Sequence, residues 1–200
     1  MNIDIIQIGS NVGNNEGDPI WVILQEKDHS IIFIEPLETS FVKLKETYKN
    51  KINCYFENCA ILDYDGEVDF YYQENQTDNT RNNQQASIHK DWWNGKNKDI
   101  TKVKCSKLET VVGKYNMLNI PFYLLQIDAE GSDDLILLST DFNKVLPSLI
   151  RFESIHYKKD ELNKIISYLN KFGYKEIPDT FFSGKERGYN TLLQKNESKI

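Results

Sequence analysis

The chain has 200 residues, a length typical of one domain with a single core. Hydrophobic residues make up 40% and aromatic residues 12% of it, a composition that excludes a disordered chain. No apolar run reaches the roughly eighteen residues of a membrane-spanning helix. The formal net charge of -6 argues against binding to a phosphate backbone, so neither a nucleic acid nor a membrane is a predicted partner.

The N-terminus and the cysteines bear on the compartment. MNIDIIQIG has no basic flank, no apolar stretch of signal length and no small-residue cleavage site, which predicts a cytoplasmic location. Cys54, Cys59 and Cys105 lack metal-type C-x-x-C spacing, so we interpret them as buried, reduced thiols. The sequence offers no basis for predicting the oligomeric state.

Short apolar runs alternate with amphipathic segments, a pattern typical of β-α-β units and a parallel sheet. Helical spacing predicts a helix along 37–48 and another along 162–172, and Ser132 is expected to cap a helix that carries Leu135 and Leu138. The expected strands are 3–8, 31–35, 52–56, 67–72, 122–127, 148–152, 174–177 and 189–193, the last two forming an antiparallel pair.

A long polar segment interrupts this order. Residues 73–100 are mostly polar, with Trp92 and Trp93 as their largest apolar groups, and a polar insertion of about 73–102 is therefore predicted within a single domain, 1–200. The two indoles could stack on a sugar ring, but the favoured interpretation is that they anchor the loop to the domain.

The segment GSNVG follows the first strand directly and is predicted to cradle a ligand. Glycine permits a close approach of the backbone and a positive φ. Glu35 ends the second strand, where a carboxylate can accept hydrogen bonds from both hydroxyls of an adenosine ribose. Together these features predict an adenosine-cofactor site that includes Gly9, Ser10, Asn11, Gly13 and Glu35.

Charge favours S-adenosylmethionine over a dinucleotide as the cofactor. The dinucleotide fingerprint needs a third glycine, which is absent, and Glu16 and Asp18 follow the loop closely. Two carboxylates would repel a pyrophosphate, whereas S-adenosylmethionine carries no phosphate and has a cationic sulfonium and a cationic ammonium group.

The segment QIDAEGSDD lies at the carboxyl end of the strand 122–127, the edge at which open α/β sheets bind ligands. Asp128 would project from that end beside the glycine loop, and it is predicted both to contact the cofactor and to act in catalysis. Asp133 and Asp134 fit the simpler interpretation of acids stabilised by a helix dipole.

The segment RFESIH brings Glu153 and His156 to the same rim, so Asp128, Glu153 and His156 are the candidate catalytic residues, with Asp128 or His156 preferred as general base. His29 and His89 are interpreted as solvated. The acids Asp128, Glu130, Asp133 and Glu153 could hold a divalent cation, but their spacing matches no recognised signature, and no metal ligand is predicted.

These motifs together resemble those of the FkbM-type methyltransferases along almost the whole chain. IDAEG followed by an acid, with EP upstream, is fairly specific to that family, whereas the glycine loop is shared with many others. The matching segments are IQIGSNVGNNEGDPI, FIEPLETSF, ENCAILDYDGEVDFY, LLQIDAEGSDDLILL, LIRFESIH and LNKFGYKEI.

The resemblance implies a Rossmann-like class I fold of the α/β class, with a mostly parallel seven-stranded sheet of order 3-2-1-4-5-7-6 and helices on both faces. It implies O-methylation of a hydroxyl, commonly on a sugar, glycan or secondary metabolite. It also implies a place for each part of the donor: Gly9, Asn11 and Gly13 line the methionine portion, Glu35 holds the ribose, and Asn58, Cys59 and Ala60 border the adenine. Asp128 would face both the donor and the acceptor. The chain departs from the family pattern in two places. Little chain precedes the first strand, so no N-terminal cap over the acceptor pocket is expected. Asn190 stands where close relatives are expected to have an acid.

Three other classes are open on the sequence alone. A nicotinamide-dependent oxidoreductase is disfavoured by the acids after the glycine loop and by the missing third glycine. A non-catalytic cofactor-binding module is disfavoured because Gly9, Gly13, Glu35 and Asp128 are intact. A nucleic-acid methyltransferase is the least favoured, because the chain is acidic and lacks an Asn-Pro-Pro-Tyr or Pro-Cys motif at the fourth strand.

Overall fold

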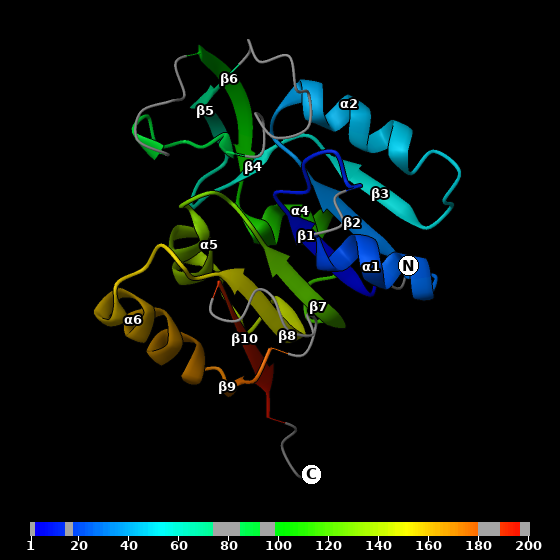
Figure 1. Cartoon of the computed structure of the whole chain (residues 1–200). Helices are drawn as coiled ribbons and strands as arrows, with labels where there is room; N and C mark the ends of the chain where they lie inside the picture. Colours follow the sequence, from blue (N-terminus) through cyan, green and yellow to red (C-terminus); the bar gives the residue numbers. More distant parts are fainter. Residues whose placement is uncertain (1–2, 15–17, 74–84, 93–98, 180–188, 197–200) are drawn as a thin grey trace.

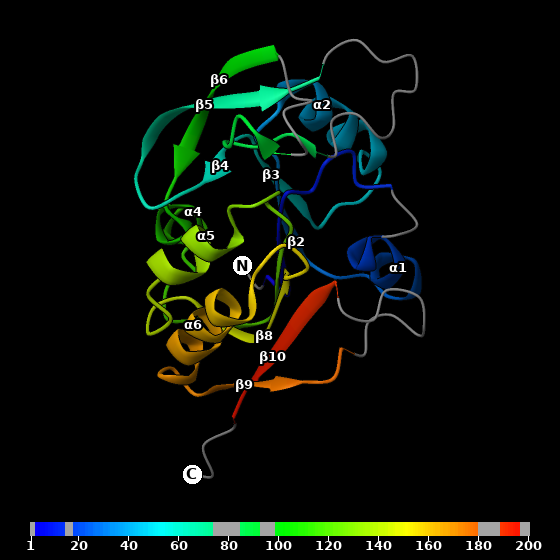
Figure 2. The ribbon, with the colours of Figure 1, turned by 60° about the vertical axis from the view of Figure 1, so that its left-hand side comes forward.

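A large sheet forms the centre of the molecule, and a small three-stranded sheet lies at one end of it (Figures 1 and 2). The computed structural model of the protein describes residues 3–14, 18–73, 85–92, 99–179 and 189–196. Within these residues the large sheet contains β1 (Ile5–Ile8), β2 (Ile31–Ile34), β3 (Cys54–Glu57), β7 (Pro121–Ile127), β8 (Leu146–Glu153), β9 (Tyr174–Ile177) and β10 (Asn190–Lys195).

The large sheet has the strand order β3-β2-β1-β7-β8-β10-β9. Counted along the chain within this sheet alone, the order is 3-2-1-4-5-7-6, and the expected fold class is confirmed. β3, β2, β1, β7 and β8 are parallel, whereas β10 pairs antiparallel with both β8 and β9. The carboxyl ends of the parallel strands therefore meet at one edge, which is where such sheets bind ligands.

Helices cover both faces of the large sheet (Figure 1). On one face, Ile20 of α1 and Leu44 of α2 pack with Ile5 and Phe33 of the sheet. Strands covered on both sides need apolar residues at every position, which explains the near-continuous apolar runs of the sequence. The helices are α1 (Pro19–Glu26), α2 (Glu38–Thr47), α4 (Leu108–Lys114), α5 (Asp133–Ser139) and α6 (Lys159–Asn170), of which α4, α5 and α6 pack on the second face.

The small sheet is built from β4 (Ala60–Ile61), β5 (Gly66–Tyr72) and β6 (Asp99–Ser106), in the order β4-β6-β5. β5 and β6 are antiparallel, and a single bridge joins Tyr71 of β5 to Ser87 of the polar insertion. The described part of that insertion therefore returns to the edge of β5.

Several expectations from the sequence are wrong in detail. The segment 99–106, expected in part as loop, is β6, since Val103 and Cys105 face inward while Lys102 and Lys104 face solvent. α1, α4 and β4 were not predicted.

Two expected apolar contacts also fail. Leu138 is 42% exposed because α5 packs through Ile136 and Leu137, and Ile52 is 91% exposed because β3 starts only at Cys54. Trp93 lies outside the described residues.

The cysteine prediction is largely confirmed. Cys59 and Cys105 are buried, Cys54 is half-buried, and all three are free thiols. Burial raises the pKa of Cys59 to about 12 and that of Cys54 to about 11, which keeps both protonated at neutral pH. No helix in the described part of the chain combines the length and apolar character that a bilayer crossing requires.

Candidate active site

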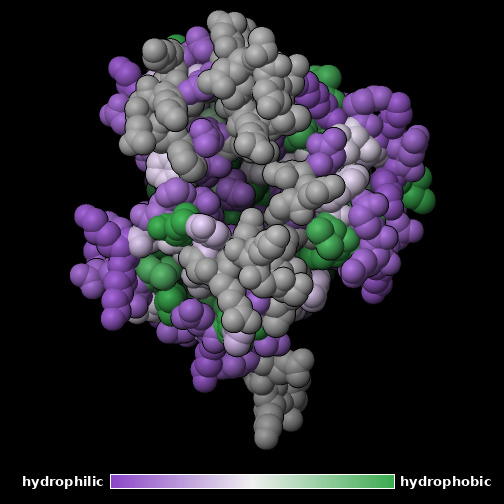
Figure 3. All heavy atoms as spheres, in the orientation of Figure 1, coloured by the Kyte–Doolittle hydropathy of each residue, from purple (hydrophilic) through white to green (hydrophobic). Residues whose placement is uncertain are grey.

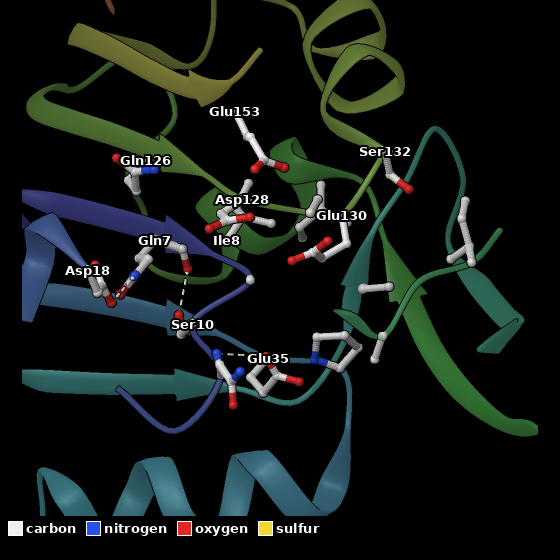
Figure 4. Close-up of a pocket in the computed structure, with 18 of the residues that line it drawn as sticks. Gln7, Ile8, Ser10, Asp18, Glu35, Gln126, Asp128, Glu130, Ser132 and Glu153 are labelled. Atoms are coloured by element: carbon white, nitrogen blue, oxygen red, sulfur yellow. Dashed lines mark hydrogen bonds between the residues drawn. The ribbon is translucent and has the colours of Figure 1, made fainter. Parts of the chain in front are cut away.

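A cavity of about 410 Å³ opens at the carboxyl edge of the parallel strands. Figure 3 shows a hollow on this face of the molecule, with both hydrophilic and hydrophobic residues visible inside it. The glycine loop and Glu35 border one part of the cavity, and Asp128 borders another (Figure 4). The sequence-predicted donor and catalytic residues thus meet, for the most part, at a single site.

The glycine loop takes a backbone shape that side chains would block. Gly9 has φ +78°, and a Cβ there would lie 1.8 Å from the carbonyl oxygen of Asp128. Gly13 has φ +71°, and a Cβ there would lie 2.5 Å from the ring of Tyr48. Asn11 between them also has a positive φ, of 47°, which asparagine tolerates better than most residues. The loop therefore needs both glycines.

Hydrogen bonds fix the loop against β2 and α2. The buried hydroxyl of Ser10 donates to the carbonyl of Gln7, and it accepts from the Ile34 amide at 3.2 Å. The hydroxyl of Thr47 donates to the carbonyl of Val12 at 2.9 Å, and the Tyr48 hydroxyl donates to the carbonyl of Gly13. These four bonds hold the glycine loop against its neighbours.

Glu35 is buried at the end of β2 and lines the cavity. Its carboxylate accepts from the Asn11 amide at 2.8 Å and from the Leu37 amide at 2.9 Å. Burial raises its pKa to about 7 despite these two bonds. The amide of Asn58 donates to the carbonyls of Glu35 and Pro36, so Asn58 holds the backbone behind the acid, and it is not among the described residues of the cavity wall.

The wall beyond Glu35 is apolar. Cys59 and Ala60, the residues expected beside the adenine, line it together with Ile61, Phe70 and Ile88. Ile88 comes from the polar insertion, so the insertion supplies part of this wall. A flat, apolar ligand such as a purine base fits this chemistry.

Asp128 and Glu153 both line the cavity, at the ends of neighbouring strands β7 and β8. His156 is not among the described lining residues; its Nε2 lies 3.2 Å from Glu153 Oε2, and its ring meets Trp92 edge-on at 4.7 Å between centroids. Burial lowers the pKa of His156, so the imidazole is neutral at neutral pH. The structure therefore brings the three candidates together but places His156 behind Glu153.

Asp133 is the first residue of α5, at the helix end where it was expected, and it is also buried. It is 1% exposed, and its carboxylate accepts from the amides of Ala129 and Glu153. Burial, reinforced by the charges of Asp128 and Glu153, raises its pKa well above the usual value. Asp133 thus joins the β7–α5 loop to the end of β8. Ser132 occupies the expected N-cap position, but its side chain makes no capping bond.

A buried polar row crosses the large sheet beside the cavity, and it was not predicted from the sequence. Gln7, Gln126 and Arg151 are paired in register on β1, β7 and β8, and all three line the cavity. Gln7 donates to Asp18 at 2.7 Å, and Arg151 contacts Gln126 at 3.2 Å and Asp179 at 2.9 Å. The available signal was a polar residue inside each of three apolar strands, since burying such a group requires hydrogen-bond partners.

The polar insertion is bound to the β7–α5 loop. Ser87 Oγ donates to the carbonyl of Glu130 at 2.7 Å, and the ring nitrogen Nε2 of His89 lies 3.0 Å from the carbonyl of Gly131. Trp92 Nε1 donates to the carboxylate of Glu130 at 2.8 Å, and its ring fills the space where a Gly131 side chain would be. These contacts agree with the favoured interpretation that Trp92 anchors the loop.

The other two histidines differ from each other. The interpretation of His29 as solvated is wrong, because its side chain is 13% exposed and its Nδ1 lies 3.5 Å from Asp4 Oδ2. Asp4 directly precedes β1, and His29 lies two residues before β2. Because β1 and β2 are adjacent and parallel, the two residues lie close together. His89 is exposed, as expected, although its ring contacts Gly131. No group of acids, histidines or cysteines in the described residues is arranged to hold a metal ion.

A glycine-lined cavity at the carboxyl edge of a 3-2-1-4-5-7-6 sheet, with an acid at the end of the second strand, defines a Rossmann-like methyltransferase. The sequence profile of the methyltransferase FkbM domain matches residues 7–176. The chain therefore belongs to the FkbM family of S-adenosylmethionine-dependent methyltransferases. No curated protein sequence matches it.

Comparison with solved structures finds similar chains at low sequence identity. The chain is similar to methyltransferase FkbM from Methylobacillus flagellatus KT, with a TM-score of 0.54 and 13% identity, over 96% of this chain and 43% of that one. Aeropyrum pernix fibrillarin, in complex with natively bound S-adenosyl-L-methionine, gives a TM-score of 0.49 at 10% identity, over 96% of this chain and 66% of that one. The chain thus spans less than half the length of the Methylobacillus protein.

Proposed function

We propose that this chain transfers a methyl group from S-adenosylmethionine to a hydroxyl of a small-molecule or glycan acceptor. Family membership supports methyl transfer. The observation that carries the proposal is the single cavity that joins the glycine loop and Glu35 to the acids Asp128 and Glu153. A nicotinamide-dependent oxidoreductase is not favoured by any feature of this site.

The residues of the wall fit the parts of the donor. Both oxygens of Glu35 already accept a backbone amide, and each has a further lone pair for a ribose hydroxyl. The apolar wall at Ala60 and Phe70 suits the adenine, and the loop Gly9–Gly13 allows the methionine portion to approach the backbone. When bound, the donor supplies an electrophilic methyl group on a sulfonium.

Asp128 is the general base in this proposal. It lies at the end of β7 beside the glycine loop, and its carboxylate can take the proton of the acceptor hydroxyl as the O–CH₃ bond forms and the S–CH₃ bond breaks. Positioning of the acceptor oxygen about 3 Å from the methyl carbon can lower the barrier by several kcal/mol. General-base catalysis typically adds about 10²- to 10⁴-fold.

Glu153 borders the acceptor side of Asp128, and His156 acts on it as a positioning residue. His156 Nε2 lies 3.2 Å from Glu153 Oε2, and Trp92 packs edge-on against the imidazole, so the two rings lie beside the carboxylate. This assignment keeps all three predicted catalytic residues in the site but gives them unequal roles.

A methyl-uptake assay tests the proposed function. The protein is incubated with S-adenosylmethionine labelled in the methyl group and a panel of neutral, cationic and anionic sugars and glycosides. Transfer to an alkali-stable ether on one class of acceptor is expected. Donor binding by calorimetry without transfer to any hydroxylated acceptor, or transfer to nitrogen only, would contradict the O-methyltransferase assignment.

Donor affinity is expected to depend on pH through Glu35. The ribose hydroxyls donate to the carboxylate form, whereas the pKa of about 7 leaves Glu35 mostly protonated below neutral pH. Donor binding must then displace a proton, so the Kd for S-adenosylhomocysteine should be about tenfold higher at pH 6 than at pH 8. Calorimetry across this range measures the change.

The matched variants are Glu35→Gln and Glu57→Gln. Glu57 is an acid at the end of the neighbouring strand β3, but it pairs with Lys114 and Tyr115 and is not among the lining residues described. Glu35→Gln should weaken donor binding by at least about tenfold and flatten its pH dependence. Glu57→Gln should keep both. An unchanged pH profile in Glu35→Gln would remove Glu35 from the ribose role.

A further inference from the structure

A buried hydroxyl in the cavity wall is left without a hydrogen bond by the described part of the chain. Ser132 is 4% exposed and lines the cavity, and among the described residues its Oγ has no hydrogen-bond partner. Buried polar side chains in folded proteins almost always have such a partner. A hydroxyl of this kind in the wall of a ligand cavity indicates that a group of the ligand supplies the partner.

The helix that follows Ser132 does not use this hydroxyl. Ser132 stands at the N-cap of α5, where a serine side chain usually accepts from an amide of the first turn and the backbone is extended. Here ψ is 6°, and the side chain makes no capping bond. The carboxylate of Asp133 instead binds the Ala129 amide in the loop before the helix. Capping, the role that the sequence predicts for Ser132, therefore does not explain a serine at this position.

Ser132 lies at the end of the cavity that has the apolar wall. Leu135, three residues further along α5, packs against the hydrophobic cluster that includes Ala60 and Phe70. Both of these residues line the cavity, as does Ile88, which packs against the same cluster. Side chains three residues apart at the start of a helix lie on one side of it, so Ser132 and Leu135 face the same wall.

The parts of the cavity follow one another in the order of the parts of the donor. In Figure 4, Gln7 and Asp18 lie on one side of the cavity and Ser132 on the other, with Glu35 between them. The strand β1, which carries Gln7, leads directly into the glycine loop, where the proposed function places the methionine portion. With the ribose at Glu35, the base extends toward the apolar wall and Ser132.

Adenine needs two kinds of contact from such a site. Its faces are apolar, and Ala60, Phe70 and Ile88 match them. Its edge is polar, because the 6-amino group donates and the ring nitrogens N1 and N7 on either side of it accept. A serine hydroxyl both donates and accepts, so it can bind any of these three groups. An apolar wall alone would hold any flat base, whereas a hydroxyl that loses its partner penalises the wrong base.

We propose that Ser132 hydrogen-bonds the adenine edge of the methyl donor, at the 6-amino group or at one of the ring nitrogens beside it, and thereby selects adenine. This inference rests on the proposed function, because it names a donor contact within the same site. It makes Ser132 a specificity-determining residue for the base. The bond forms only in the complex, so it contributes to donor affinity and not to the stability of the free protein.

Ser132→Ala removes the hydroxyl and tests the proposal. Calorimetry with S-adenosylhomocysteine should show a Kd raised by about threefold to tenfold, the value of one hydrogen bond. The same titration is made with three analogues of this ligand, which lack the 6-amino group, N1 (1-deaza) or N7 (7-deaza). The effect of the substitution should disappear with the analogue that lacks the partner of Ser132. The Tm of the ligand-free variant should equal that of the native protein, because no hydrogen bond of the described chain is lost.

Ser40→Ala is the matched control. The Ser40 hydroxyl in α2 is also buried and has no hydrogen-bond partner among the described residues, but Ser40 is not among the lining residues described. The Kd values of this variant should equal the native values for every ligand.

Two results would overturn the role of Ser132 and leave the proposed methyltransferase activity intact. One is a native Kd for S-adenosylhomocysteine in Ser132→Ala. The other is a loss of affinity in this variant that is the same with S-adenosylhomocysteine and with all three analogues. A native protein that does not bind S-adenosylhomocysteine would overturn the proposed function as well.

Discussion

Asp128→Asn is expected to slow methyl transfer by about 10²- to 10⁴-fold, with donor affinity changed by less than about threefold. The amide keeps the size and the polar contacts of the side chain at the end of β7, but it cannot accept the hydroxyl proton. Single-turnover transfer from labelled donor measures the rate, and calorimetry with S-adenosylhomocysteine measures the affinity. The loss should appear in the chemical step and not in Kd.

Asp134→Asn is the matched control, because it removes a carboxylate six residues further along, outside the described wall of the cavity. It should transfer methyl groups at the native rate. Transfer within about threefold of native in Asp128→Asn would exclude Asp128 as the base. If Glu153→Gln transfers methyl groups much more slowly while Asp128→Asn keeps the native rate, the general base is Glu153.

The strands of the large sheet were predictable because their physical requirement is simple. A strand covered on both faces needs apolar residues throughout, and runs such as Ile31–Ile34 have no other good explanation. β6 was harder to predict, because its outward-facing lysines make the segment as polar as a loop. Its inward-facing Val103 and Cys105 become informative only once β5 is beside them.

The donor half of the site was also predictable, and the reason is local. A glycine required by positive φ and a carboxylate at the end of the next strand are features of short segments, and parallel strands bring them to one edge. Gln7, Gln126 and Arg151 carried a similar signal, a polar residue near the end of an apolar strand. That signal becomes compelling only when the register places all three in one row.

The remaining parts of the site depend on contacts between distant segments. Asp133 and Asp134 are adjacent acids at the start of α5, yet the first is buried as a link to Glu153 while the second remains near the surface. Likewise, Ser87 and Glu130 are 43 residues apart, and neither segment alone indicates the hydrogen bond between them. Composition and spacing describe a segment, whereas burial is decided by its neighbours in the fold.

Gly9→Ala should abolish measurable donor binding, with Kd raised by at least about 100-fold. It should also lower the free energy of unfolding by about 3 kcal/mol or more compared with the control variant Gly173→Ala. A methyl group at Gly9 would lie 1.8 Å from the carbonyl oxygen of Asp128, which is backbone and can yield only if β1 and β7 separate. Such a shift distorts the glycine loop and displaces Asp128 together.

Gly173→Ala is the control that separates the clash from the dihedral cost. Gly173 has φ +87°, close to the +78° of Gly9, but a Cβ there meets nothing within 4 Å. Both variants carry the cost of about 1–2 kcal/mol for an alanine at positive φ, so their difference measures the contact with Asp128. In a chain of this length that difference corresponds to a Tm about 6–12 °C lower for Gly9→Ala. Equal Tm values for the two variants would show that the glycine loop is not in tight contact with the Asp128 carbonyl. Donor binding retained by Gly9→Ala would show that the donor does not depend on the glycine loop.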